Sequence, residues 1–129
     1  MKKNQEIHFE LGRSIVGQCG FLVSKVLFTK KSFNTDFLII DAGMNDLIRP
    51  ALYNSLHKII NISSKNEKNM NYDIVGPICE SSDIFANNYN LPISSRNDHI
   101  VICSTGAYGE AMSSNYNLRN SLNSYFSDT

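Results

Sequence analysis

Residues 14–41 read SIVGQCGFLVSKVLFTKKSFNTDFLIID, and this stretch decides the fold class. The run at 14–30 is rich in Val, Ile, Leu and Phe with small polar residues between them, which is typical of strands. SFNT at 32–35 predicts a polar turn, and DFLIID at 36–41 predicts a short buried strand. We therefore expect β structure from Arg13 to Asp41, folded as a hairpin.

The rest of the chain continues this pattern outward from the hairpin. Pro50 limits AGMNDLIRPALYN to a short helix or ordered loop, and AYGEAMSSNYN predicts one or two helical turns. SSKNEKNMN at 63–71 predicts an exposed loop, and IFANN at 84–88 a short segment followed by a polar loop up to residue 98. Further strands are predicted in HKIINI, at the start of YDIVGPIC and in HIVIC. The sum is a mainly β domain, a sandwich or barrel with short helices.

Length and charge exclude several functional classes. A chain of 129 residues suits one domain. Lys plus Arg and Asp plus Glu both number 12, so the chain lacks the basic surface expected for a nucleic-acid or anionic-membrane partner. No apolar run approaches the roughly 20 residues of a membrane span, and MKKNQEIHFE has no apolar core of a secretory signal. We expect a protein without a membrane anchor.

Cysteine and histidine spacing argues against metal sites and disulfides. The three cysteines form no CxxC pair, and their odd number is a poor disulfide framework. A reducing, cytoplasmic compartment is therefore expected. The histidines at 8, 57 and 99 show no HExxH or paired spacing, so no zinc site is predicted. GxSxG, GxxxxGK[ST] and GxGxxG motifs are also absent from the sequence.

Two arginines stand in places suited to anion binding. Gly12 before Arg13 allows a close backbone approach, and exposed N–H groups there can hold a phosphate. Arg49 and Tyr53 are four residues apart and would point to the same side, where they could bind a carboxylate. The residues alone still favour the simpler alternatives, which are a turn glycine with a surface arginine and a solvated arginine with a half-buried tyrosine.

A stronger signal is the pair Cys79–Glu80 in GPICESSD at 76–83. A thiol that follows a turn and precedes polar residues can donate a proton or act as a nucleophile, and the neighbouring carboxylate can bind an ammonium group. Cys19 and Cys103 lie in apolar runs and are predicted to be core residues. Tyr108 follows small residues, so its phenol can reach a phosphate; a packing tyrosine is the alternative.

Taken in order, four segments resemble the C-terminal part of diaminopimelate decarboxylases. The segments are ELGRSIVG, DAGMNDLIRPALY, YDIVGPICESSD and STGAYGEAMSSNYN, and the resemblance covers residues 9–119. These enzymes use pyridoxal 5'-phosphate and have the alanine-racemase-like fold type. The resemblance implies conversion of meso-2,6-diaminopimelate to L-lysine and CO2 in lysine biosynthesis. It also implies that this chain lacks the N-terminal (β/α)8 barrel, which carries the Schiff-base lysine.

The same resemblance implies roles for individual residues. The segment Glu10, Leu11, Gly12, Arg13 matches a phosphate-cradling turn, with Leu11 in place of the usual proline. Arg13 and Arg49 match arginines that bind substrate carboxylate, and Tyr53 matches the phenol beside them. Cys79 matches the proton donor, Glu80 the carboxylate that binds the distal ammonium, and Tyr108 a tyrosine that contacts cofactor and substrate.

Organisation and partners are also implied by the resemblance. Residues 1–12 match a remnant of the barrel's end and phosphate turn, and 13–129 match the C-terminal β domain. In such enzymes the Cys-Glu loop completes the active site of a neighbouring subunit, so a homodimer or a second, barrel-bearing chain is the expected partner. Asn120 replaces a usual proline, which suggests a truncated product. A non-catalytic remnant and an ornithine- or arginine-type decarboxylase domain are the alternatives.

Overall fold

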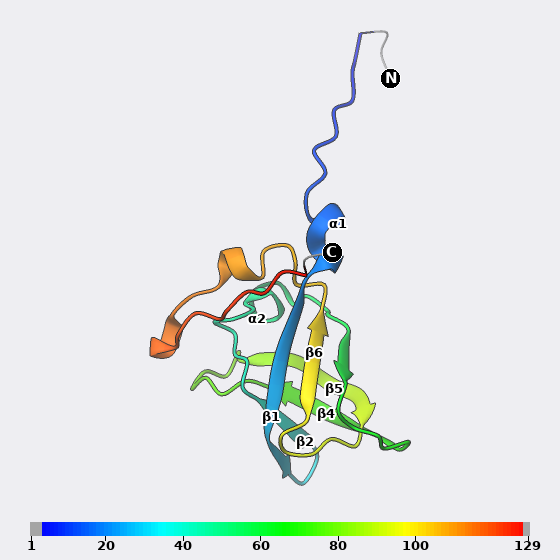
Figure 1. The fold of residues 1–129 in the computed structure, drawn as a ribbon, viewed down its shortest axis with the longest axis vertical. Coiled ribbons are helices and arrows are strands. Elements are labelled where there is room, and N and C mark those ends of the chain that lie inside the picture. The colour runs from blue at the N-terminus through cyan, green and yellow to red at the C-terminus, as the bar shows by residue number, and fades with distance from the viewer. Residues whose placement is uncertain (1–3, 128–129) are drawn as a thin grey trace.

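Six strands form one sheet in the computed structural model, which describes residues 4–127 (Figure 1). Their order across the sheet is β3-β6-β1-β2-β4-β5. β2 and β4 pair in parallel, and all other neighbouring strands pair antiparallel. The strands are β1 (Phe21–Lys31), β2 (Asp36–Ile40), β3 (Ile59–Asn61), β4 (Asn69–Val75), β5 (Ile84–Pro92) and β6 (His99–Cys103).

The two edge strands approach each other, so the sheet is nearly closed like a barrel. The backbone N–H of Ile59 on β3 donates to the hydroxyl of Tyr89 on β5 over 2.9 Å. Beside this seam, the side-chain amide of Asn61 donates to the hydroxyl of Ser94 over 2.8 Å. Closure of this kind covers strand edges that would otherwise expose unpaired backbone groups. The mainly β prediction is confirmed.

The core lies inside this curved sheet. Because alternate residues of a strand point to opposite faces, every second residue is buried on these strands, as with Leu38 and Ile40 on β2 or Tyr72 and Ile74 on β4. Complete burial of such a side chain contributes about 1.5–3 kcal/mol. The largest fully buried side chains are Leu38, Ile40, Leu47, Ile74, Ile100, Ile102 and Val26.

Short helices connect and flank the strands. They are α1 (Arg13–Val16), η1 (Gly17–Cys19), α2 (Arg49–Tyr53), η2 (Glu110–Met112) and η3 (Tyr116–Leu118). The described part of the predicted segment 1–12 extends away from the sheet (Figure 1). Its first three residues lie outside the described residues, as do 128–129 of the tail. Among the described residues, no helix has the length and apolar character needed to cross a membrane.

The predicted hairpin is confirmed, but its first part is not β structure. β1 pairs with β2 up to Lys31 opposite Asp36, and the turn is closed by a hydrogen bond from the Ser32 N–H to the Thr35 carbonyl. Residues 13–19, which were predicted as strand, are helical instead. The reason is the lack of a partner: β6 ends at Cys103, which pairs with Phe21, so earlier residues have no neighbouring strand.

The sequence predictions for two cysteines and for two loops also need correction. Cys19 is exposed in η1 and is not a core residue, and Cys103 at the end of β6 is only half-buried. The first part of the segment after IFANN is strand, because β5 continues to Pro92, whereas residues 93–98 form the predicted loop. β4 begins at Asn69, within the predicted loop 63–71. Asparagine side chains form hydrogen bonds across these two strands. Because they stand where apolar residues usually alternate, the sequence lacked the pattern by which strands are recognised.

Candidate functional site

Arg49 and Tyr53 stand on one side of α2, as their spacing predicted. Pro50 is tolerated because it occupies the first turn, where its missing N–H would have no helical partner. The helix ends at Asn54, whose φ of 51° is left-handed. The guanidinium carbon of Arg49 lies 5.0 Å from the centre of the Tyr53 ring, within cation–π range.

Tyr108 joins the same cluster from the loop that follows β6. Its ring centre lies 5.7 Å from the guanidinium carbon of Arg49. The φ of Tyr108 is 64°, an uncommon conformation for a bulky residue and one that is often found at functional sites. Tyr53 is 56% exposed and Tyr108 51% exposed, so one cation and two phenols form an open group of hydrogen-bond donors.

The loop that carries Tyr108 is fixed by backbone contact with η1. The N–H of Thr105 donates to the Gly20 carbonyl over 2.9 Å, and the N–H of Gly106 donates to the Gly17 carbonyl over 3.0 Å. A Cβ on Gly20 or on Gly106 would collide with the other chain segment. These two glycines therefore permit the close approach that places Tyr108 above α2.

The predicted phosphate turn lies apart from this cluster. Gly12 precedes α1, and a Cβ added there would meet no atom within 4 Å. Glu10, Leu11 and Arg13 are exposed. Within residues 4–127, the cation–π contacts with Tyr53 and Tyr108 come from Arg49 and not from Arg13. The structure brings together Arg49, Tyr53 and Tyr108, and it leaves the role of residues 10–13 a prediction.

Cys79 and Glu80 are exposed in the turn between β4 and β5. The turn is closed by two hydrogen bonds, from the Gly76 N–H to the Asp83 carbonyl (3.0 Å) and from the Asp83 N–H to the Glu80 carbonyl (3.1 Å). Glu80 Oε1 accepts from the Ser81 N–H over 2.9 Å. The Cys79 thiol makes no hydrogen bond to another described residue. Both groups are thus presented outward, free to meet a molecule outside this chain.

A hollow of about 290 Å³ lies beside Glu80. Met44, Asn45 and Ile48, which immediately precede α2, form part of its wall, and Tyr116 closes another side. The hollow therefore connects the Cys79–Glu80 turn with the segment that carries Arg49. The amide oxygen of Asn45 is buried without a hydrogen-bond partner in the described chain. Sequence reasoning missed Asn45 and Tyr116 as wall residues, although both lie in the quoted motifs.

Two buried carboxylates next in sequence to residues of its wall were also missed. Asp83 accepts hydrogen bonds from the Met44 N–H (2.6 Å) and the Ile78 N–H (2.7 Å). Burial raises the pKa of Asp83, and Asp46 adds to this effect, while the two hydrogen bonds and Arg119 partly oppose it. Asp46 accepts from the Gly43 N–H (2.8 Å) and lies 3.8 Å from the guanidinium of Arg119.

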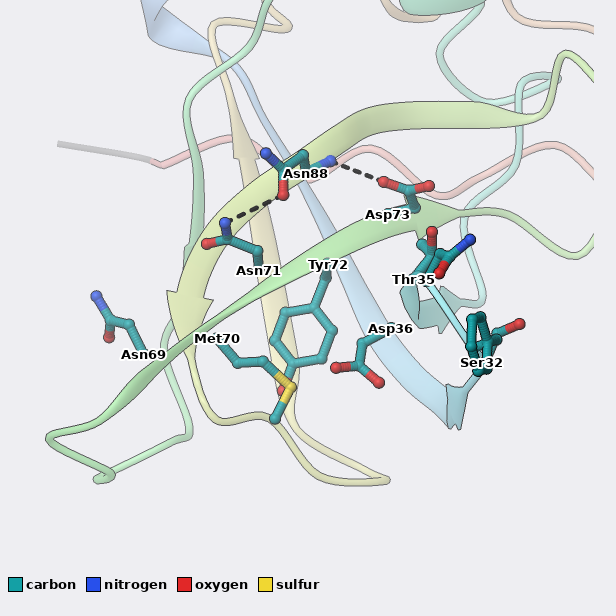
Figure 2. A pocket seen from close by; sticks show the side chains of 11 residues that line it. Ser32, Thr35, Asp36, Asn69, Met70, Asn71, Tyr72, Asp73 and Asn88 are labelled. Carbon is teal, nitrogen blue, oxygen red and sulfur yellow. Dashed lines mark hydrogen bonds between the residues drawn. The ribbon is translucent and has the colours of Figure 1, made fainter.

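A larger hollow of about 550 Å³ lies elsewhere, between the β1–β2 turn and the faces of β4 and β5 (Figure 2). Two hydrogen bonds join polar groups of its wall: the Asn71 amide donates to the Asn88 side-chain oxygen, and the Asn88 N–H donates to Asp73. None of the predicted site residues lines it. The larger hollow is therefore not the candidate site.

Comparison with known proteins identifies relatives over almost the whole chain. Residues 14–106 match the model of the family described as "Pyridoxal-dependent decarboxylase, C-terminal sheet domain". A diaminopimelate decarboxylase of Bacteroides thetaiotaomicron is 53% identical over 128 residues, which cover 99% of this chain and 33% of that protein. One from Aquifex aeolicus is 47% identical over 88% of this chain and 27% of its own length.

A solved structure matches as well. A mutant diaminopimelate decarboxylase from Helicobacter pylori, crystallised with L-lysine, superimposes with a TM-score of 0.82 and 47% identity. The match covers 88% of this chain and 28% of that one. This chain thus spans about a third or less of the length of the relatives that it matches.

Proposed function

The chain belongs to the pyridoxal-dependent decarboxylase family, with that family's C-terminal sheet domain, and we propose that it serves as the C-terminal part of a diaminopimelate decarboxylase. The reaction would convert meso-2,6-diaminopimelate to L-lysine and CO2 in lysine biosynthesis. The observation that carries this proposal is the Arg49 guanidinium beside the two half-exposed phenols of Tyr53 and Tyr108. It is supported by the names of relatives that are 47–53% identical.

The residues present fit part of a pyridoxal phosphate site. Tyr108 offers an exposed phenol beside a cation, and the segment Glu10, Leu11, Gly12, Arg13 would add backbone donors and a second guanidinium to the phosphate. Every described lysine is exposed, on β1, before β3 or in the β3–β4 loop. We propose that a lysine outside the described residues, on a barrel of the family's type, provides the anchor. When bound, the cofactor supplies an electron sink for the decarboxylation.

Arg49 and Tyr53 would hold and orient a substrate carboxylate. A guanidinium gives two parallel N–H donors to the two oxygens of a carboxylate, and the phenol gives a third donor. Pro50 lies in the first turn and the left-handed Asn54 ends the short helix, so its backbone presents the two side chains on the same side. We propose that Arg13, which begins α1, also binds this carboxylate when the chain meets its partner.

Cys79 would deliver a proton, and Glu80 would recognise the far end of the substrate. When the bond between the D-centre carbon and its carboxylate breaks, CO2 leaves and the electron pair stays with the carbon. The thiol of Cys79 gives that carbon a proton. The carboxylate of Glu80 binds the distal ammonium of diaminopimelate. Both residues point outward, which fits an active site shared between two chains. The three free thiols of the chain support a reducing, cytoplasmic location.

The test is a decarboxylation assay with a supplied barrel. The purified chain and pyridoxal phosphate are mixed with the separately expressed barrel of a relative, and release of CO2 from meso-diaminopimelate is measured. We expect activity only in the complete mixture, and a loss of about 10²–10⁴-fold in Cys79→Ala. Cys19→Ala is the matched control, because Cys19 is equally exposed but lies in η1. No activity and no complex with the barrel would favour the non-catalytic alternative. Activity on ornithine alone would favour the other decarboxylase class.

A further inference from the structure

The carboxylate of Asp83 sits where two separate segments of the candidate site meet. Its Oδ2 accepts from the N–H of Ile78, which immediately precedes Cys79 in the turn. Its Oδ1 accepts from the N–H of Met44, a residue 39 positions away in the segment that leads into α2. Asp83 is only 3% exposed, so water does not compete for these bonds. One side chain thus ties the thiol-bearing turn to the arginine-bearing helix.

Gly76 makes room for this carboxylate. A Cβ placed on Gly76 would collide with both oxygens and the carboxyl carbon of Asp83. Its backbone φ is not positive, so conformational freedom is not the reason for a glycine at this position. The absent side chain is the reason, because Asp83 packs directly over the backbone of the turn that it closes.

Neighbouring contacts strengthen the same connection. The Ser82 hydroxyl donates to the sulfur of Met44 over 3.5 Å, so the turn and the segment before α2 meet a second time. Asp46, on that segment, is bonded to the Gly43 N–H and approached by Arg119 from the C-terminal region. Asp46 and Arg119 are the charged groups that act on Asp83.

We propose that Asp83 is a positioning residue that holds the Cys79–Glu80 turn at a fixed place relative to Arg49. This inference rests on the proposed function, because Cys79, Glu80 and Arg49 are the groups that it would align. Asp83 itself touches neither substrate nor cofactor. An isosteric amide cannot replace it, because both carboxylate oxygens accept from different N–H donors and asparagine has only one such oxygen.

The connection can be tested without catalysis by NMR on the isotope-labelled chain. The amide signals of Met44 and Ile78 are followed together with the Asp83 carboxyl carbon as pH is lowered. We expect all three to share one midpoint above the ordinary value of 3.8, because one carboxylate accepts both bonds. Independent midpoints, or amides that do not respond, would overturn the proposal. Asp83→Asn should abolish the shared titration, whereas Asp73→Asn should preserve it. Asp73 is the matched control because one oxygen accepts one N–H there.

The positioning role is tested by kinetics with the barrel supplied. Asp83→Asn should lower kcat/KM by about tenfold or more, and Gly76→Ala should have a similar effect because its methyl group displaces the carboxylate. In an Asp83→Ala background, Gly76→Ala should change kcat/KM by less than about twofold, since the collision is gone. Additive losses, or wild-type kinetics in Asp83→Asn, would refute the positioning role. An inactive wild-type mixture with an intact shared titration would instead refute the proposed function and leave the connection standing.

Discussion

Two hollows in the described part of this domain differ in size and, more usefully, in the residues that line them. In the larger one, Asn71, Asn88 and Asp73 satisfy one another across β4 and β5 (Figure 2). In the smaller one, the Asn45 amide oxygen has no partner in the described chain, and Glu80 is exposed at the rim. Residues of the quoted motifs, among them Asn45, Glu80 and Tyr116, line the smaller hollow, whereas none of the predicted site residues lines the larger one. The lining residues identify the candidate site better than volume does.

One buried core stabilises the sheet that carries both hollows. Ile74 on β4 is fully buried and pairs with Leu38 of β2. Ile74→Ala should lower the free energy of unfolding by about 2–5 kcal/mol, because it removes buried carbon and leaves a cavity. Urea unfolding followed by circular dichroism measures this. Ile62→Ala is the matched control, since Ile62 is 60% exposed, and it should cost less than about 1 kcal/mol. Equal losses would contradict the assigned core.

Arg49, near the smaller hollow, should be needed for the geometry of its guanidinium as well as for its charge. Arg49→Lys keeps the charge but loses the paired donors, so kcat/KM on meso-diaminopimelate should fall by about 10–100-fold in the barrel-supplemented assay. Arg96→Lys is the matched control, because Arg96 also lies over an aromatic ring, that of Phe28, at 5.0 Å. If both variants behave alike, the cation–π geometry at Arg49 has no functional meaning.

A smaller effect is expected on the pH dependence of stability, and it comes from the buried carboxylate of Asp83. Burial raises the pKa of Asp83 in the folded chain above 3.8, its ordinary value in the unfolded chain. Between these two values the folded chain binds more protons, so the contribution of Asp83 to stability is largest below 3.8 and falls as pH rises through the folded pKa. The difference in free energy of unfolding, wild type minus Asp83→Asn, should therefore decrease over this window. Urea titrations at a series of pH values measure it, and a difference that grows with pH would reverse the assignment.

Local rules predicted part of this structure well. Pro50 and the four-residue spacing from Arg49 to Tyr53 predicted a short helix or ordered loop with both side chains on one side, and the segment is the short helix α2. The turn at Gly76 and the outward Cys79–Glu80 pair also follow from neighbouring residues. These features depend on contacts within a few positions, which is the range that sequence patterns describe.

Long-range contacts explain what the sequence did not reveal. Residues 14–19 have a strand-like composition, but β6 is too short to pair with them. Asp83 is one of several acidic residues in the sequence, and its importance emerges only because the fold brings it to the N–H of Met44, 39 positions away. The contact between Gly20 and Gly106 depends in the same way on two distant segments meeting.

The contrast between the two hollows is tested most directly by one pair of acid-to-amide substitutions. Glu80→Gln changes the rim of the smaller hollow, and Asp73→Asn changes the wall of the larger one. The Michaelis constant for meso-diaminopimelate is measured with the barrel supplied. We predict that Glu80→Gln raises KM by about tenfold or more, because the distal ammonium loses its charged partner, while Asp73→Asn leaves KM unchanged. An unchanged KM in Glu80→Gln, or a raised KM in Asp73→Asn, would contradict the assignment of the smaller hollow as the working site.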